Sequence, residues 1–272
     1  MSRTLHARWI LPFVLLAAAW ALWRNGAVQH WRAIGPGLEF STLNGEPFCR
    51  RGSSLIAVVR FDPARVRLRV RHFSGIADRP LSVVDWQRET RAQVVFNAGQ
   101  YYPDFRYMGL LVSGGRVVSA RAHAEFQAAL VARRDGTGAR VLDLSRERVS
   151  VDTLAWGEVA QSFMLFGRGG ELRVRRSDRI ANRTVVAEDS RGRVLVFVSE
   201  GGYTLAEYAD VLRHARMGLA EAMSMDGGLE AELVVARGGF RYASFGDWRD
   251  GHASDALGAR TPLPAVITLE AP

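Results

Sequence analysis

The sequence predicts an α+β domain with mixed, largely antiparallel sheets and a few packed helices. Three observations predict this class. Short apolar segments bounded by turn residues recur along most of the 272 residues, and such segments are typical of strands. Few segments have helical spacing, and no regular repeat is present. A hydrophobic content of 48% is sufficient for one sizeable core, so we expect a single domain behind a short N-terminal apolar segment.

The N-terminal segment has the pattern of an export signal. Two arginines and a histidine precede an uncharged apolar run over residues 9–23, and Arg24 follows the run. The run is short for a membrane span, which needs about 20 residues, but the tryptophans near its ends suit a membrane interface. We therefore interpret residues 1–24 as a signal peptide or a signal-anchor, with the anchor slightly favoured. The alternative is a buried core helix.

The domain organisation follows from this interpretation. We expect a linker over residues 25–39, where Gly and Pro are frequent, and one domain over residues 40–270. Either form of export signal places the domain in the periplasm or outside the cell. An anchor at residues 9–23 would hold it at the inner membrane.

Strand-like segments dominate the chain after the linker. A continuous apolar run at residues 55–61 predicts a buried strand, and strict alternation with Arg over residues 66–72 predicts a strand with one solvated face. Residues 189–192 have the composition of a hairpin turn. The other expected strands are residues 93–96, 108–112, 116–119, 140–144, 148–153, 158–166, 172–174, 184–187, 193–199 and 219–225.

Two segments have the periodicity of helices. Residues 81–91 have helical spacing, and Ser82 suits the N-cap. Thr204, with Glu207 three residues later, has the sequence of a capping box. The apolar residues that follow Thr204 keep helical spacing, and Gly218 is a natural stop.

The charge and the cysteine content limit the function classes. The net charge is +8, but all 36 basic residues are arginines and they are spread along the chain, so we expect no nucleic-acid partner. Arginine binds phosphate bidentately, which leaves an anionic substrate plausible. The single cysteine, Cys49, permits neither an intramolecular disulfide nor a Cys-based metal site.

Two loops share one design, an apolar strand that ends in a polar residue followed by glycine. In the first loop Asn97 is followed by Ala98 and Gly99, and in the second Asp226 is followed by Gly227 and Gly228. A strand end places the polar side chain at the rim of a sheet, and glycine lets backbone N–H groups approach a ligand. Taken alone, each loop is also an ordinary turn sequence.

The order of motifs around these loops resembles the phosphodiester glycosidase family. The likeness extends from about Leu81 to Val266. It rests on a helix and strand before Asn97, an aromatic residue after the glycine, and a capped helix and strand before Asp226. The matching segments are Asn97-Ala98-Gly99-Gln100-Tyr101, Gly109-Leu110-Leu111-Val112, Gln161-Ser162, Arg183-Thr184, Tyr203-Thr204-Leu205, Asp226-Gly227-Gly228 and Leu263-Pro264.

The resemblance implies a hydrolase of glycosyl phosphodiesters, like the uncovering enzyme that removes N-acetylglucosamine from a phosphate, here acting on envelope or exopolysaccharide glycans. Cleavage at an anomeric carbon needs a carboxylate, for which we expect Asp226. We expect Arg183 to hold the phosphate and Asn97 to bind sugar hydroxyls or the phosphate. These three side chains should converge on one cleft. The other expected substrate-binding residues are Gly99, Tyr101, Asp104, Gln161, Ser162, Gly227 and Gly228.

The sequence departs from the family pattern at two places. Leu229 and Glu230 follow Asp226-Gly227-Gly228 where small residues are usual, and Phe163-Met164 follow Gln161-Ser162 where Gly-Pro is common. The departures favour the alternative of an inactive glycan-binding or envelope-assembly protein on the same fold. Glu230 and Glu232 could also supply a carboxylate that the family pattern lacks, but on an alternating strand they are more often a solvated face.

Two of the expected site residues have simpler alternative roles, and the sequence also allows expectations about metal ions. Asp226 has the alternative of a turn aspartate, and Arg183 that of a strand-end salt bridge. The six histidines show no metal-ligand pairing, so we expect no transition metal. No cofactor is required by the expected chemistry. Oxygen-ligated Ca²⁺ or Mg²⁺ near Asp226 and Asp104 remains an open alternative.

Overall fold

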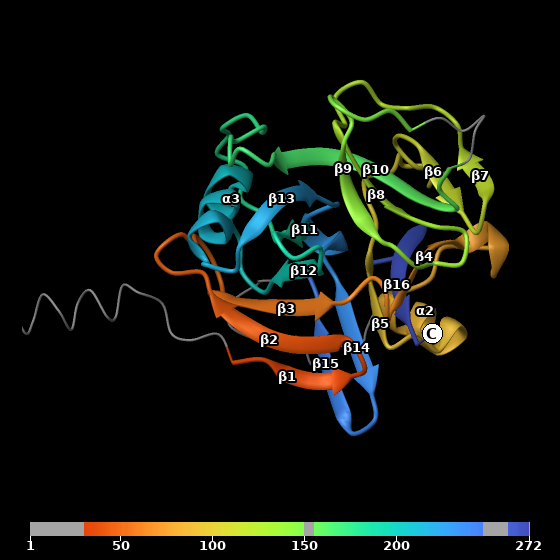
Figure 1. Ribbon diagram of the computed structural model, residues 1–272, viewed down its shortest axis with the longest axis horizontal. Coiled ribbons are helices and arrows are strands. Elements are labelled where there is room, and N and C mark those ends of the chain that lie inside the picture. The colour runs from red at the N-terminus through yellow and green to blue at the C-terminus, as the bar shows by residue number, and fades with distance from the viewer. Residues whose placement is uncertain (1–29, 150–154, 247–260, 272) are drawn as a thin grey trace, which may run out of the picture. The chain divides into compact units, whose positions relative to one another are not determined.

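Two antiparallel sheets form the framework of the computed structural model, which describes residues 30–149, 155–246 and 261–271 (Figure 1). The expected export signal at residues 1–24 lies outside the described residues. Among the residues described, no helix has the length and apolar character to span a membrane. Residues 31–272 cluster as one compact unit, which agrees with the predicted single domain of the α+β class.

The larger sheet contains eleven strands. Its path is β1 (Arg32–Gly35), β2 (Leu38–Asn44), β3 (Leu55–Phe61), β12 (Val194–Ser199), β11 (Thr184–Asp189), β13 (Leu219–Ser224), β10 (Glu158–Phe166), β6 (Leu111–Ser113) and β7 (Arg116–Ser119). Two further strands branch from β10, namely β8 (Ala128–Ala132) and, beside it, β9 (Arg140–Asp143).

The smaller sheet contains five strands and carries the first predicted loop. Its order is β15 (Phe240–Ser244), β14 (Leu233–Arg237), β5 (Val94–Asn97), β16 (Ala265–Glu270) and β4 (Arg67–His72). The helical elements of the described chain are η1 (Phe73–Gly75), α2 (Val83–Thr90), α3 (Leu205–His214) and η2 (Gly228–Glu230).

The main core lies between the two sheets, and strand alternation produces it. In β3, Ala57, Val59 and Phe61 belong to this core, whereas Ile56 and Val58 pack on the opposite face with α3. The strands of the smaller sheet alternate in the same way and send a second set of side chains toward α2. Each sheet is therefore apolar on both faces, and a helix covers part of its outer face (Figure 1).

Local capping positions both helices as the sequence predicts. Ser82 Oγ accepts a hydrogen bond from the Asp85 N–H at 3.2 Å at the start of α2. Thr204 and Glu207 form the complete capping box at the start of α3. Trp86 of α2 is fully buried against the smaller sheet, and its Nε1 donates to the Leu263 carbonyl at 2.9 Å. This contact fixes α2 against β5, the strand that ends at Asn97.

Most predicted strands are confirmed, but two expectations differ from the structure and a third is not tested. The expected linker over residues 25–39 contains β1 and the start of β2, because Ile34 and Leu38 pack into the main core. Residues 172–174 form a single bridge from Leu172 to Phe166 instead of a strand. Most of the segment 148–153 lies outside the described residues. Five strands over residues 40–270 were not predicted, namely β2, β8, β14, β15 and β16.

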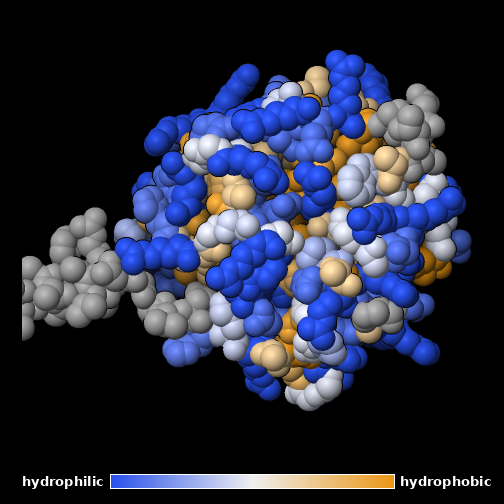
Figure 2. Space-filling model, viewed as in Figure 1, coloured by the Kyte–Doolittle hydropathy of each residue, from blue (hydrophilic) through white to orange (hydrophobic). Residues whose placement is uncertain are grey.

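The surface is largely hydrophilic on the face shown in Figure 2, as the dispersed arginines predict. The arginines of β4 are an exception to the expected solvated face. Arg69 is half-buried and pairs with the fully buried Glu158 at 3.2 Å, and Arg71 pairs with Glu270 at 2.6 Å. These alternating arginines therefore bind neighbouring carboxylates in addition to facing solvent.

The first prediction concerns the packing of α2. Trp86→Ala removes a fully buried side chain and a hydrogen bond to the Leu263 carbonyl, so we expect the free energy of unfolding to fall by about 3–5 kcal/mol. Trp86→Phe keeps most of the apolar contact and should lose less. Urea denaturation followed by circular dichroism measures both values. Equal stability of Trp86→Ala and the wild type would contradict the assigned packing.

Candidate active site

The two predicted glycine loops lie side by side where the sheets meet. The Asp226 N–H donates to the Ala98 carbonyl at 3.1 Å, and Gln100 Nε2 donates to the Met225 carbonyl at 3.3 Å. Residues 98–100 follow β5 of the smaller sheet, whereas residues 225–226 follow β13 of the larger one. The ends of two strands from different sheets therefore form one continuous loop cluster.

Asn97 connects this cluster through its side-chain amide, which is 1% exposed. Nδ2 donates to the carbonyls of Asp226 at 2.9 Å and Ala98 at 3.1 Å. Oδ1 accepts from Thr184 Oγ1 at 2.7 Å and from the Glu232 N–H at 3.3 Å. Both amide protons and both acceptor positions are thus in use. Asn97 consequently holds the two loops together, and its contact with sugar or phosphate stays a prediction.

Asp226 is a half-buried residue beside Asn97. Its Oδ1 accepts a hydrogen bond from the Gly227 N–H at 2.9 Å. Burial, and then the negative charge of Glu230, raise the pKa of Asp226 from 3.8 to about 7. The Gly227 N–H and the cationic Arg179 and Arg183 act in the opposite direction. At neutral pH the group therefore exchanges a proton readily, as a general base or acid requires.

Arg183 approaches the same loop from the start of β11. Its Nε donates to the Tyr203 carbonyl at 3.0 Å, and its Nη2 donates to the Arg179 carbonyl at 2.7 Å. Nη1 lies 3.5 Å from where a side chain on Gly227 would begin. Burial, and then the like charge of Arg179, lower the pKa of Arg183 to about 10, so the guanidinium is charged at neutral pH. Arg183 is therefore a buried cation next to the Asp226 loop.

The three glycines serve the packing of the loops. A Cβ on Gly99 would overlap the Tyr107 hydroxyl, and one on Gly227 would lie 2.7 Å from the Asn182 carbonyl. Gly228 has a φ of 80°, which other residues rarely adopt. Each N–H already has a partner in the protein, Tyr107 for Gly99, the Asp226 carboxylate for Gly227 and Asn182 for Gly228. The structure therefore differs from the prediction that these amides face a ligand.

Gln161 and Ser162 support the loops from β10. Both the oxygen and the nitrogen of the Gln161 side-chain amide are used. Oε1 accepts from the N–H groups of Leu110 and His123, and Nε2 donates to the carbonyls of His123 and Phe126. Ser162 is fully buried and donates to Gln100 Oε1 at 3.1 Å. These contacts hold the chain around the first loop, and the contact of both residues with substrate stays a prediction.

Tyr101 reaches the candidate site, but no contact in the described chain connects Asp104 to it. The Tyr101 hydroxyl donates to Glu230 Oε1 at 3.3 Å. Asp104 is exposed and accepts from Arg106 Nε at 2.6 Å, and hydrogen bonding to Arg106 lowers its pKa. The predicted second carboxylate, Asp104, is therefore engaged by its own turn.

Glu230 is the residue that sequence reasoning placed wrongly. The positive φ of Gly228 starts the short η2 turn, so the strand β14 begins only at Leu233. Glu230 is consequently half-buried beside Tyr101, and Glu232 is 2% exposed. The expected solvated face of these two glutamates is wrong, because strand alternation does not extend to them. The two glycines before them were the available signal.

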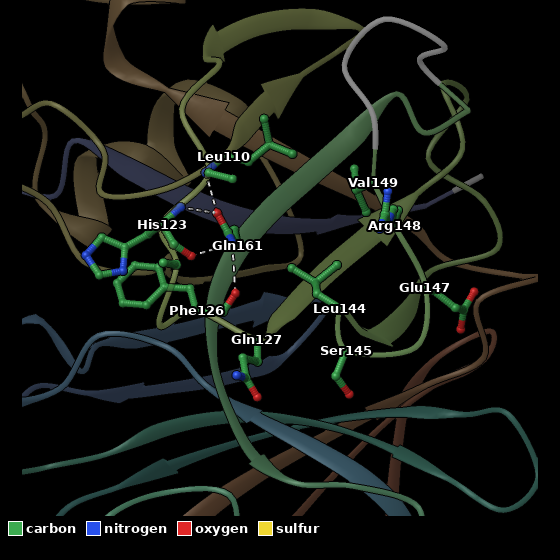
Figure 3. Close-up of a pocket in the computed structure, with 12 residues that line it drawn as sticks. Leu110, His123, Phe126, Gln127, Leu144, Ser145, Glu147, Arg148, Val149 and Gln161 are labelled. Carbon is green, nitrogen blue, oxygen red and sulfur yellow. Dashed lines mark hydrogen bonds between the residues drawn. The ribbon is translucent and has the colours of Figure 1, made fainter.

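A separate pocket of ≈ 340 Å³ lies beside β10 (Figure 3). Leu110, Phe126, Leu144 and Val149 supply apolar side chains, and the Gln161 amide lies in the wall with its hydrogen bonds to the surrounding backbone. Asn97, Arg183 and Asp226 do not line it. This pocket is therefore distinct from the cluster of predicted catalytic residues.

No group of three or more His, Cys, Asp or Glu side chains in the described parts of the chain is arranged to hold a metal ion. The expected neighbours of a Ca²⁺ or Mg²⁺ ion, Asp226 and Asp104, have other partners: the Gly227 N–H for Asp226 and Arg106 for Asp104.

Comparison with known proteins identifies the family of the chain and proteins of similar fold. A model of the phosphodiester glycosidase family matches residues 90–267. The fold is similar to that of a hypothetical protein from Synechocystis, with a TM-score of 0.65 and 13% identity over 91% of this chain and 64% of that one. It is also similar to the pro-peptide-inhibited catalytic domain of zebrafish N-acetylglucosamine-1-phosphodiester alpha-N-acetylglucosaminidase, with a TM-score of 0.59 and 17% identity over 90% of this chain and 89% of that one. Among curated proteins, none matches the sequence significantly.

A second prediction tests the role of Asn97. Asn97→Asp places a carboxylate oxygen against the Asp226 and Ala98 carbonyls in a buried position, so we expect the free energy of unfolding at pH 8 to fall by at least about 3 kcal/mol. The surroundings raise the pKa of the new carboxyl group, so stability should recover as the pH falls below it. Urea denaturation at pH 5 and pH 8 measures the difference. The control Asn44→Asp keeps the exposed acceptor for the Glu46 N–H and should have little effect.

A third prediction follows from the raised pKa of Asp226. Its folded pKa of about 7 exceeds the ordinary 3.8, so the stability associated with the protonated form is full below pH 4 and is lost as the pH rises to 7. Asp226→Asn resembles the protonated form. We expect the variant to match the wild type near pH 4 and to be more stable by about 4 kcal/mol above pH 7. Thermal unfolding across this range measures it, and a pH-independent difference would refute the assignment.

Proposed function

Because the chain belongs to the phosphodiester glycosidase family, we propose that it hydrolyses glycosyl phosphodiesters at the anomeric carbon of the sugar. The observation that carries this proposal is the adjacency of Asp226 and Arg183 on one loop cluster. Asp226 is a carboxyl group with a pKa of about 7, and Arg183 is a buried cation beside it. Hydrolysis of a glycosyl phosphodiester is favoured by a proton acceptor near the sugar and a cation near the phosphate.

Asp226 would act as the general base. A water molecule attacks the anomeric carbon, and Asp226 takes its proton as the new carbon–oxygen bond forms. The bond between the anomeric carbon and the phosphate oxygen breaks, and its electron pair stays on the phosphate. A phosphate leaving group is acidic, so it needs no proton from the protein. Asp226 then returns its proton to solvent.

Arg183 would hold the leaving phosphate. Two of its nitrogens are fixed on the Tyr203 and Arg179 carbonyls, so the guanidinium is oriented before substrate binds. An oriented donor in a partly buried site stabilises developing charge better than a mobile one. Arg179, whose positive charge acts on both Arg183 and Asp226, is a second cation near the phosphate position.

We place the reaction outside the cytoplasm, in envelope or exopolysaccharide metabolism. The support is the charged-then-apolar N-terminal sequence, with its uncharged run at residues 9–23 as a membrane anchor. The partner is then a glycan or sugar-phosphate substrate, with the membrane contacted only through the N-terminal segment. Alkaline phosphatase fused after residue 40 provides the test, because it is active only when exported.

One observation favours a second candidate, a glycan-binding protein without activity. Leu229 and Glu230 follow the Asp226-Gly227-Gly228 segment, and Leu229 is 50% exposed at this position. An exposed apolar side chain beside the site suits a binding surface as well as a substrate contact. The two candidates differ only in turnover.

The fourth prediction separates them. Sugar release is measured from a panel of sugar 1-phosphodiesters with the wild type, Asp226→Asn and Arg183→Lys. We expect turnover by the wild type, a loss of kcat/KM of at least about 100-fold in Asp226→Asn, and a loss of about 100-fold in Arg183→Lys, since lysine keeps the charge but not the fork of donors.

Asp135→Asn is the matched control, because Asp135 lies in an exposed turn and binds only Thr137 there. It should retain wild-type kinetics. Absence of turnover across the panel, with glycan binding intact by calorimetry, would refute the enzyme and favour the binding protein. Equal kinetics of Asp226→Asn and the wild type would exclude Asp226 as the base.

A further inference from the structure

The site contains a second carboxylate, Glu230, that the proposed mechanism does not use. Glu230 ends the η2 turn that follows Gly227, four residues after Asp226. The positive φ of Gly228 begins the turn. The backbone of Gly246 lies so close to Leu229 that a Cβ there would be 2.8 Å from the Leu229 Cα. The turn that carries Glu230 is therefore fixed by the chain on both sides.

Three contacts align the two loops of the site in register. The Ala98 carbonyl accepts from the Asp226 N–H at 3.1 Å, Gln100 Nε2 donates to the Met225 carbonyl at 3.3 Å, and the Tyr101 hydroxyl donates to Glu230 Oε1 at 3.3 Å. The same hydroxyl lies 3.4 Å from the Pro262 carbonyl. Residues 98–101 thus contact both Asp226, through Ala98, and Glu230, through Tyr101.

Three acidic side chains act on the Tyr101 hydroxyl. Burial, and then the charges of Glu230, Asp226 and Glu232, raise the pKa of the Tyr101 hydroxyl, so it stays protonated and donates. The hydrogen bond from the Tyr101 hydroxyl fixes the position of the Glu230 carboxylate at this point. Glu230 therefore presents a fixed negative charge in the immediate surroundings of Asp226.

We propose that Glu230 is a positioning residue of the active site: Tyr101 orients its carboxylate beside Asp226, and its negative charge keeps Asp226 able to accept the proton of the attacking water. This inference rests on the proposed function for the identity of the reaction. The coupling between the two carboxylates is a property of the free protein and is measured without substrate.

The charges around Asp226 come from every element packed against it. Glu230 of η2 favours its protonated form, while the Gly227 N–H, Arg179 and Arg183 favour the ionised form. Tyr101 and Tyr107, which follow β5, also interact with the Asp226 charge, but their own pKa values are raised, so both are neutral near pH 7. Burial is the first cause of the raised Asp226 pKa, and Glu230 is the charged group that raises it further. Without Glu230, Asp226 would become a weaker base.

The test is the titration of Asp226 in the full chain. The ¹³C carboxyl resonance of Asp226, assigned with Asp226→Asn, is followed against pH in the wild type, Glu230→Gln and Tyr101→Phe. The midpoint should lie near pH 7 in the wild type and move to lower pH by about one unit in Glu230→Gln. Tyr101→Phe frees the glutamate from the loop and should move the midpoint in the same direction by less.

The pH dependence of kcat/KM gives the matching kinetic result. A base acts only when deprotonated, so the acidic limb of the wild-type profile lies at the Asp226 pKa, and Glu230→Gln should shift it to lower pH by the same amount. A merely structural role would lower activity at every pH without moving the limb. Glu89→Gln, an exposed glutamate on α2, is the control and should change neither result.

The role of Glu230 and the proposed hydrolase function are contradicted by different results. An unchanged Asp226 midpoint in a folded Glu230→Gln protein, verified by circular dichroism, overturns the role of Glu230 whether or not the protein is an enzyme. A shifted midpoint without turnover on any sugar phosphodiester supports the coupling and overturns the proposed function. A shifted midpoint with a shifted kinetic limb supports both.

Discussion

The candidate site depends on the four hydrogen bonds of one buried amide. Asn97 ends a strand of the smaller sheet, yet its Oδ1 accepts from Thr184 of the larger sheet and its Nδ2 donates to the Asp226 carbonyl. Two carbonyls and a backbone N–H among its partners fix which end of the amide is oxygen. An amide supplies two donors and two acceptor positions in one plane, a set that neither a carboxylate nor a hydroxyl has. Asn97 therefore sets the distance between the sheets at the edge where Asp226 and Arg183 meet.

The same constraint explains why glycines cluster at this edge. Strands from two sheets end within hydrogen-bond distance of each other, so the loops that follow them have little room for side chains. Gly99 lies under the Tyr107 hydroxyl, and Gly227 lies against the Asn182 carbonyl. Glycine is required here by the protein's own backbone and side chains, and the amides point inward. The groups left to face a substrate are side chains, chiefly those of Asp226 and Arg183.

Much of this arrangement could be predicted from the sequence, and the rest depends on tertiary contacts. Alternation and apolar runs located β3, β4, β5 and β10, and capping residues located both helices, because these signals are local. The motif order identified the residues of the two loops. The roles of Asn97 and Gln161 could not be predicted, because the partners of a side-chain amide lie on strands far away in the sequence. Glu230 was placed on a strand because the pattern around it alternates, whereas the backbone turn at Gly228 removes it from the strand.

Like charges stand together on each side of this site. Arg183 lies beside Arg179, and Asp226 beside Glu230, and in both cases burial and the like charge shift the pKa toward the neutral form. Neither arrangement favours the free protein, because the loss of hydration and the like-charge neighbour outweigh the attraction between Asp226 and the two arginines. In the proposed reaction the transition state carries positive charge at the anomeric carbon and negative charge on the departing phosphate. The carboxylates would stabilise the first and the guanidinium groups the second. Interactions that are unfavourable before binding and satisfied in the transition state are those that accelerate a reaction.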